Sequence, residues 1–346
     1  SAILFENAYT VYPESIKGLF SVLCSRYPAV DTNPELYERV QTPSIAQMLG
    51  QSAYRTALFH SGRFSYLGMD SIIRNRGYQM IEDAGAISGN FNSSFGVDEP
   101  ATVNRILAWL DSLPPNERFL VTYLPIAGHH PYDSPEPRPF RGHKEIDRYR
   151  NALHFGDAAL GELLEGLKKR GLDRNTLFVI FGDHGEAFGQ HEGNYAHTFF
   201  IYDENVRVPC IIAAPGLIKA PIRVTRCASL IDLAPTILDL LGITGPPDYQ
   251  GKSLLDKEEQ LALFFTDYSL GLLGLRDGRW KFIYELESGR SKLFDLAHDP
   301  EETIDLAKDF PEHVDSYRKR LTAWSGAQRA LLAQPKALAF QRTIAR

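Results

Sequence analysis

The stretch FVIFGDHGEAFGQHEGNYAHT, residues 178–198, points most directly to an α/β architecture. It opens with an apolar run whose length and composition are typical of a strand buried on both faces. A polar loop punctuated by glycines follows, and in an open α/β sheet ligands bind outside the carboxyl ends of the strands. We therefore expect a binding site in this loop. Its candidate residues are Asp183, His184, Glu186, His191 and His197.

Asp183 and His184 stand side by side directly after the expected strand. A carboxylate oxygen and an imidazole nitrogen together can bind one divalent metal ion. The alternative is that both side chains only satisfy hydrogen bonds of the turn, as aspartate often does after a strand. The presence of three histidines in one loop favours metal or anion binding.

Apolar, β-rich runs alternate with amphipathic helical stretches from residue 1 to about residue 255. This pattern predicts an α/β fold with a large mixed, mostly parallel sheet flanked by helices. Further buried strands are expected at 119–124 and 210–213. Helices are expected around residues 16–23 and 103–110, and over 145–170, where Gly171 ends the last of them.

From residue 261 onward the pattern changes to short strands, and Asp277-Gly278 between two of them is a strong hairpin signal. A small antiparallel sheet is therefore expected, covered by a final helix from about Pro311 to Gln334. The stretch TGPPDYQGKS lies before the change and is rich in proline and glycine. We predict two domains, 1–255 and 256–346.

Composition excludes several classes of protein. Hydrophobic residues make up 44% of the 346 residues and charged residues 23%, which excludes disordered and collagen-like chains. The net charge is −6 and no segment concentrates lysine and arginine, so neither nucleic acid nor a membrane surface is an expected partner. No run of about 18 apolar residues exists, so no membrane span is expected. The three cysteines lack C-x-x-C spacing, which argues against a disulfide framework or a cysteine zinc site.

Two further groups of residues are candidates for chemistry. His129 and His130 follow the strand expected at 119–124 and resemble a binding loop, with His130 as the one that only packs, because neighbouring side chains on an extended segment point in opposite directions. Ser15 precedes a helical apolar pattern, where an N-cap is the ordinary interpretation. A hydroxyl at a helix N-terminus is also placed to attack phosphorus or sulfur, because the helix dipole stabilises anionic oxygens.

Several segments, taken in this order, resemble the sulfatase family of the alkaline-phosphatase superfamily: FGDHGEAFGQHEG, ENVRVPCIIAAPG, SLIDLAPTILDLLGI, YQGKSLL, LRDGRWKFIYE and KLFDLAHDPEE. The resemblance covers nearly the whole chain. It implies a large α/β domain with a mixed sheet and a smaller C-terminal antiparallel sheet. It also implies a divalent metal ion, either Mn, Mg, Zn or Ca, and a periplasmic or extracellular location.

Carried over by position, the resemblance places the nucleophile on Ser15, which also binds the metal with Asp183 and His184. His129 matches a histidine that contacts the substrate or its leaving group, and His197 lies near an anion-binding position. Family members begin with a strand that carries acidic metal ligands. We therefore expect a further acidic ligand upstream of residue 1 and an N-terminal strand missing from the chain.

The segment around Ser15 departs from the sulfatase pattern, because Lys17 and Leu19 replace the proline and arginine that accompany oxidation to formylglycine. SIKGL resembles instead lipoteichoic acid synthase-like phosphoglycerol transferases, and FHSGRFSYLGMD, residues 59–70, resembles a substrate-binding segment of that branch. His60 and Lys17 are accordingly expected at the substrate.

The reaction implied is hydrolysis of a sulfate or phosphate ester through a covalent intermediate on Ser15. An unmodified serine favours phosphate mono- or diesters, and the substrate would be a small-molecule, lipid or glycan ester. Two alternatives stay open: a phosphoglycerol or phosphoethanolamine transferase, and a non-catalytic binding protein that retains the fold.

Overall fold

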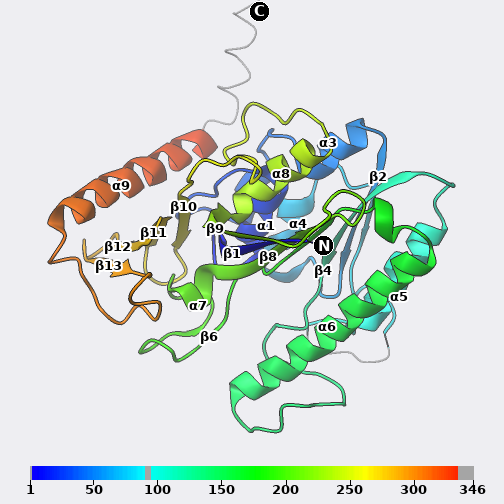
Figure 1. The fold of residues 1–346 in the computed structure, drawn as a ribbon, viewed down its shortest axis with the longest axis horizontal. Helices are drawn as coiled ribbons and strands as arrows, with labels where there is room; N and C mark the ends of the chain where they lie inside the picture. Colours follow the sequence, from blue (N-terminus) through cyan, green and yellow to red (C-terminus); the bar gives the residue numbers. More distant parts are fainter. Residues whose placement is uncertain (1, 90–94, 334–346) are drawn as a thin grey trace, which may run out of the picture.

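The computed structural model describes residues 2–89 and 95–333, and two sheets form its centre (Figure 1). The sheet that contains the first strand has the order β5 (Phe178–Phe181), β8 (Arg207–Ala213), β1 (Ile3–Tyr9), β9 (Ile222–Ser229). In this sheet β8 runs antiparallel to both β5 and β1, and β9 runs parallel to β1. The other sheet is parallel, with the order β3 (Met80–Glu82), β2 (Tyr54–His60), β4 (Arg118–Leu124).

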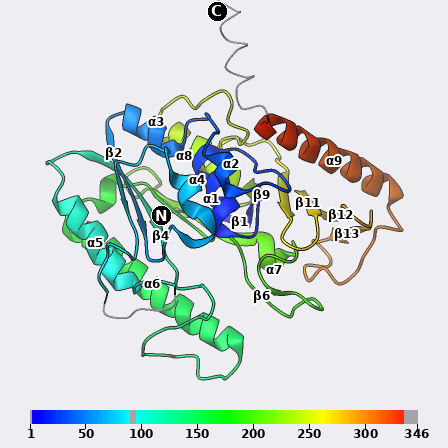
Figure 2. The same cartoon turned by 180° about the vertical axis from the view of Figure 1, so that it is seen from behind.

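Helices cover both faces of the parallel sheet, because its side chains alternate in direction (Figure 2). Leu58 and Leu120 pack against α1, α3 and α4, whereas Phe59 and Val121 pack against α5 and α6. The bounds of these helices are α1 Ser15–Cys24, α3 Ile45–Gln51, α4 Met69–Ile73, α5 Glu99–Asp111 and α6 Glu145–Lys169. Shorter elements complete this part: α2 Pro34–Tyr37, β6 Ala187–Phe188, β7 Tyr195–Ala196, α7 Asp203–Val206 and α8 Leu233–Leu240. The predicted α/β class is thereby confirmed.

The sequence prediction was wrong about the burial of β4 and β5. Both were expected to be buried on both faces, yet nearly all of their residues are only half-buried. The reason is their place in the sheets. Within the described residues, β4 pairs only with β2 and β5 pairs only with β8, so each strand keeps one open edge.

The C-terminal part is the expected antiparallel sheet, β10 (Ala262–Thr266) to β11 (Leu272–Asp277) to β12 (Trp280–Glu285) to β13 (Ser291–Asp295). Asp277 and Gly278 form the predicted hairpin, in which Gly278 adopts a positive φ of 52° that favours glycine. The helix α9 (Pro311–Ala333) covers this sheet (Figure 1). The predicted end of this helix at Gln334 lies outside the described residues, and the domain boundary at 255/256 stays a prediction.

A buried ion cluster joins the C-terminal sheet to the large α/β part. Lys281 of β12 is fully buried, and its ammonium lies 2.8 Å from a carboxylate oxygen of Asp203 and 2.8 Å from one of Glu302. Glu302 also accepts a hydrogen bond from the backbone N–H of Asp203. Glu302 is 1% exposed and depends on Lys281 alone for a cation, whereas Asp203 is 14% exposed and also lies 4.0 Å from Arg207.

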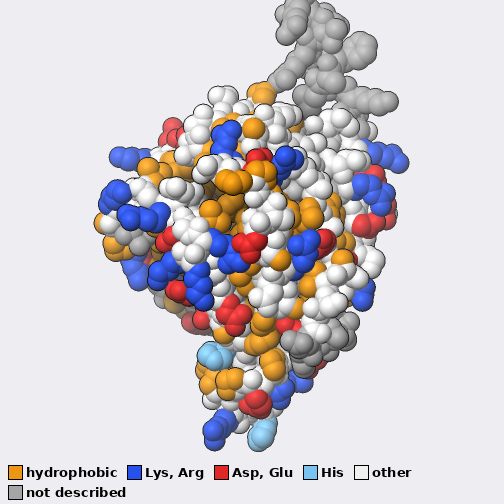
Figure 3. Space-filling model, turned by 90° about the vertical axis from the view of Figure 1, so that its right-hand side faces the viewer, with side chains coloured by type: hydrophobic (Ala, Val, Ile, Leu, Met, Phe, Trp, Pro, Cys, Tyr) orange, Lys and Arg blue, Asp and Glu red, His pale blue; other side chains and the backbone are white. Residues whose placement is uncertain are grey.

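On the face shown in Figure 3, lysine and arginine side chains are interspersed with aspartate and glutamate rather than gathered in one stripe. In the part of the chain that the structure describes, no helix combines the length and apolar character needed to cross a bilayer.

Lys281→Met should destabilise the protein by about 3–5 kcal/mol, because it leaves the carboxylate of Glu302 buried without a cation. The free energy of unfolding in urea measures this. The matched control is Arg290→Ala, which removes an ion pair with Glu285 from an arginine side chain that is 76% exposed. That control should change stability by less than about 1 kcal/mol. A Lys281→Met protein as stable as the control would contradict the assigned role of the cluster.

Candidate active site

The topology of the first sheet brings Ser15 and Asp183 together. Strands β1 and β5 are both antiparallel to β8, so they run in the same direction and their carboxyl ends lie at one edge. The loop after β1 leads to Ser15 at the start of α1, and Asp183 follows β5. The Ser15 hydroxyl donates a hydrogen bond to Oδ2 of Asp183 over 2.5 Å, although 168 residues separate them in the chain.

Ser15 does not cap its helix, so that interpretation of the sequence is wrong. The N-cap of α1 is Glu14, whose carboxylate accepts a hydrogen bond from the backbone N–H of Ile16. Burial raises the pKa of Glu14, and the neighbouring His184 partly opposes the shift. Because Glu14 serves the helix, the Ser15 hydroxyl is available to Asp183. The sequence carried little signal for this, since glutamate is not among the preferred N-cap residues.

His184 is oriented by its own loop. Its Nδ1 lies 2.8 Å from the carbonyl oxygen of Gly185 and donates to it, which leaves the lone pair of Nε2 for a ligand. That nitrogen is 3.7 Å from Oδ2 of Asp183. Loss of hydration would raise the pKa of the Asp183 carboxyl. The imidazole of His184 and the hydrogen bond from Ser15 outweigh this effect and hold the pKa below its usual value. One hydroxyl, one carboxylate and one imidazole thus converge.

Gly185 is required for this arrangement. Its backbone N–H donates to the carbonyl of Asn205 over 2.8 Å, which ties the loop after β5 to the segment that precedes β8. A Cβ atom at this position would lie 2.1 Å from the carbonyl oxygen of Glu204. Any side chain would therefore push Asp183 and His184 away from Ser15.

A second set of groups adjoins His184. The carboxylate of Glu186 accepts hydrogen bonds from the Tyr132 hydroxyl (2.7 Å) and from Nδ1 of His197 (2.8 Å). Burial would raise the pKa of Glu186, but these two donors and the imidazole of His197 lower it overall. The His197 ring stacks on His184 with their centroids 4.1 Å apart. No local sequence pattern pairs Tyr132 with this loop.

Two overlapping sets of side chains could hold a metal ion. The set expected from the sequence is Ser15, Asp183 and His184. In the other set, His184, Glu186 and His197 each offer one ligand atom, and these atoms lie within 4.8 Å of one another. His184 belongs to both sets.

His191 has a different environment from the other histidines of the loop. Its Nδ1 lies 2.6 Å from Glu204, its Nε2 lies 3.2 Å from the carbonyl of Glu302, and its ring stacks on Tyr202 at 3.6 Å. Both ring nitrogens are therefore engaged. Through the carbonyl of Glu302, His191 connects this loop to the ion cluster around Lys281.

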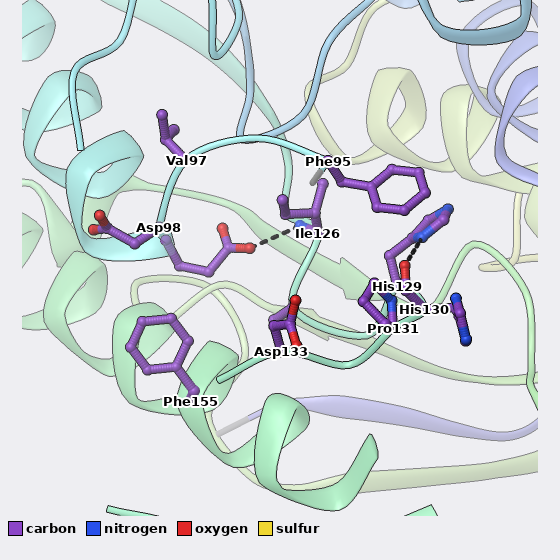
Figure 4. Close-up of a pocket in the computed structure, with 11 residues that line it drawn as sticks. Phe95, Val97, Asp98, Ile126, His129, His130, Pro131, Asp133 and Phe155 are labelled. Carbon is purple, nitrogen blue, oxygen red and sulfur yellow. Dashed lines mark hydrogen bonds between the residues drawn. The ribbon is translucent and has the colours of Figure 1, made fainter. Parts of the chain in front are cut away.

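The loop after β4 brings His129 to the same site. Its ring packs on Phe95 with the centroids 3.8 Å apart (Figure 4). The centroid of the His129 ring also lies 6.5 Å from that of His197. Nδ1 of His129 lies 2.8 Å from the carbonyl of His130, and burial lowers the pKa of the His129 imidazole. The ring of His130 points away from it in Figure 4. The packing expected of His130 is wrong, because that side chain is 63% exposed.

Glu99 fixes the position of this loop, and the sequence did not single it out. One carboxylate oxygen accepts from the backbone N–H of Ile126 over 2.7 Å, and the other accepts from the hydroxyls of Ser61 and Tyr123. Burial raises the pKa of Glu99, although these donors oppose the shift. Between Glu99 and His129 lies a cavity of only about 20 Å³ (Figure 4). A glutamate in the first turn of a helix is too common for sequence alone to reveal this role.

The two remaining candidates, His60 and Lys17, interact with other groups of the protein. His60 is buried at the end of β2, with Nδ1 2.9 Å from the carbonyl of Leu124, and burial lowers its pKa. The buried ammonium of Lys17 lies 2.7 Å from Asp267, which also accepts a hydrogen bond from Tyr12. Contacts of His60 and Lys17 with a substrate stay predictions.

Comparison with known proteins assigns the chain to a family. Residues 1–243 match the model of the sulfatase family, and residues 191–324 match the C-terminal region of N-sulphoglucosamine sulphohydrolase. Arylsulfatase K of Mus musculus is 30% identical over 260 residues, which are 67% of this chain and 45% of that protein. The chain therefore spans less than half the length of the curated relatives that it matches.

Solved structures share the fold at low sequence identity. BT4656, described in complex with its substrate D-glucosamine-2-N,6-O-disulfate, superimposes with a TM-score of 0.72 at 17% identity, covering 96% of this chain and 91% of that one. The lipoteichoic acid synthase LtaP of Listeria monocytogenes gives a TM-score of 0.68 at 21% identity, covering 93% and 84%. With a family model that spans most of its length, this chain belongs to the sulfatase family.

Proposed function

We propose that the protein is a metal-dependent hydrolase of a sulfate or phosphate ester, with Ser15 as its nucleophile. The observation that carries this proposal is the convergence of the Ser15 hydroxyl, Asp183 Oδ2 and His184 Nε2 at the N-terminus of α1. The family membership and the relatives named as sulfatases support it.

The donor set fits a divalent cation. A hydroxyl oxygen, a carboxylate oxygen and an imidazole nitrogen suit Mg, Mn, Ca or Zn to different degrees, and the orientation of His184 presents the nitrogen that a metal requires. The chemistry that such a cation supplies is a lowered pKa of the serine hydroxyl and neutralisation of charge on the ester. Ser15 itself donates a hydrogen bond to Asp183, and the dipole of α1 favours an anionic ester in front of it.

His129 is the proposed proton donor to the leaving oxygen, which takes the proton as the bond from sulfur or phosphorus to that oxygen breaks. Its loop is fixed by Glu99, and its ring is held against Phe95. Burial lowers its pKa, so the protonated form is available mainly at acidic pH. His197, oriented by Glu186, faces the same space and is the proposed contact for an ester oxygen.

The choice between the two esters depends on the state of Ser15. Sulfate transferred to a plain serine lacks the second hydroxyl that lets formylglycine expel sulfate. A phosphoserine, in contrast, can be hydrolysed by water in an in-line displacement. Because Lys17 and Leu19 replace the residues that accompany the oxidation, we favour phosphate mono- or diesters. The arylsulfatase relatives support a sulfate ester as the second candidate.

Asp183→Asn should lower the content of bound divalent metal, because it removes the charge of a ligand without changing its shape. Elemental analysis of purified protein measures the content. Glu186→Gln separates the two overlapping ligand sets. If the metal is bound through Ser15, Asp183 and His184, the Glu186→Gln protein keeps its metal. If instead Glu186→Gln loses the metal and Asp183→Asn retains it, the metal is bound by Glu186 and His197.

His129→Gln should lower kcat by about 10²- to 10⁴-fold for esters with a poor leaving group, because no proton reaches the departing oxygen. The loss should shrink for a nitrophenyl ester, whose leaving group needs no proton. His130→Gln, at the exposed neighbouring ring, should stay within about twofold of the wild type. Equal losses in both variants, or a loss independent of the leaving group, would contradict the role.

Ser15 should be an unmodified serine in the purified protein, and mass spectrometry of its peptide tests this. Parallel assays with an aryl phosphate, an aryl phosphodiester and an aryl sulfate then measure ester preference, with Ser15→Ala as the inactive reference. An aldehyde at residue 15, or turnover of the sulfate alone, would overturn the preference for phosphate while leaving the nucleophile assigned.

A further inference from the structure

A cavity of about 320 Å³ lies between the C-terminal sheet and the large α/β part. Leu272 of β11 and Ile283 of β12 line one side, and Ile201 and Tyr202, in the segment before α7, line the other. All four side chains are at most 7% exposed. Protein interiors are close-packed, and an apolar space of this size loses many dispersion contacts unless a molecule fills it. The cavity therefore has the size and the walls of a ligand site.

The pairing register of the C-terminal sheet brings a cation to this cavity. Lys292 of β13 pairs with Ile283, and side chains directly opposite each other in antiparallel strands share one face of the sheet. The Lys292 ammonium donates a hydrogen bond to the Tyr202 hydroxyl over 2.7 Å. That hydroxyl accepts from Lys292 and can still donate its own proton. Two donors thus meet at the apolar walls.

Lys292 is the charge at this cavity that no other charge neutralises. The lining also includes Arg290 and Glu285, which form an ion pair of 2.9 Å, and Asp305, whose carboxylate accepts two backbone N–H groups. In the part of the chain that the structure describes, no carboxylate lies within 4.0 Å of the Lys292 ammonium. Lys281, on the same face of the sheet, has two carboxylates at 2.8 Å. The cavity therefore suits a ligand that carries a negative charge.

Size and charge narrow the class of ligand. An apolar cavity of about 150 Å³ holds one benzene ring, so this one has room for two fused rings. One ammonium and one phenol hydroxyl match an anion with a single charge, whereas a phosphate monoester carries almost two and needs further cations. None of the described residues that line the cavity belongs to the proposed active site.

We propose that this cavity is a second binding site, separate from the proposed active site, for a carboxylate that carries two fused aromatic rings. The rings lie between Leu272, Ile283 and Tyr202, and the carboxylate accepts hydrogen bonds from the Lys292 ammonium and the Tyr202 hydroxyl. The ligand is bound and not converted, because no described nucleophile lines the cavity. This proposal does not depend on the hydrolytic function.

NMR titrations of the protein with 2-naphthylacetate and its neutral analogue 2-naphthylacetamide test the charge. We expect a Kd of about 1 mM or lower for the carboxylate and at least fivefold weaker binding of the amide. Lys292→Gln should weaken the carboxylate to the level of the amide and leave the amide unchanged. The matched control is Lys168→Gln, because Lys168 is 65% exposed on α6, which contributes no residue to the cavity.

Two further measurements locate the ligand. Leu270→Trp fills the cavity from the half-buried connection between β10 and β11, and should abolish binding of both compounds while the thermal unfolding temperature stays near that of the wild type. Inorganic phosphate and sulfate, which are ligands for the proposed active site, should not displace 2-naphthylacetate. If Leu270→Trp does not fold, the Lys292→Gln titration decides alone.

Four results would overturn the proposal. They are no binding of 2-naphthylacetate by the wild type, a preference for the carboxylate that survives Lys292→Gln, unchanged binding by a folded Leu270→Trp protein, and displacement by phosphate or sulfate. The last of these would place the compound in the proposed active site.

Discussion

The direction of strand β8 is the constraint on which the site depends. Because β8 is antiparallel to both neighbours, β1 and β5 end at the same edge, and their loops deliver Ser15 and Asp183 to within a hydrogen bond. The parallel pair β2 and β4 supports the loop that carries His129. No single loop contains the site, which exists only when the sheets are assembled.

Four carboxylates set the orientation of the reactive side chains. Glu186 and Asp183 accept hydrogen bonds and lie against imidazoles, so their pKa values are lowered, whereas burial outweighs the stabilising contacts of Glu99 and Glu14 and raises their pKa values. The first pair keeps its negative charge for a cation or a histidine. Glu99 and Glu14 instead accept hydrogen bonds from backbone N–H groups, of the loop that carries His129 and of α1 respectively.

Periodicity and turn chemistry made the fold class predictable. The elements that were predicted have a signature within about ten residues, as the Asp277-Gly278 hairpin does. Asp183 and His184 were predictable for the same reason, since they directly follow a strand. The contacts of Glu99 with Ile126 and of Lys17 with Asp267 were not, because these pairs are distant in the chain and lack a local signature. The open edges of β4 and β5 also escaped prediction, since an apolar run does not reveal how many neighbours it has.

The charges around Lys281 also constrain how this protein can evolve. Lys281 lies in the C-terminal sheet, Asp203 in the large α/β part and Glu302 in the segment before α9. Loss of Lys281 leaves Glu302, whose side chain is 1% exposed, without its cation, whereas loss of either carboxylate still leaves Lys281 one partner. Substitutions should therefore be tolerated in one order only: a carboxylate can be lost before the lysine, but the lysine cannot be lost first.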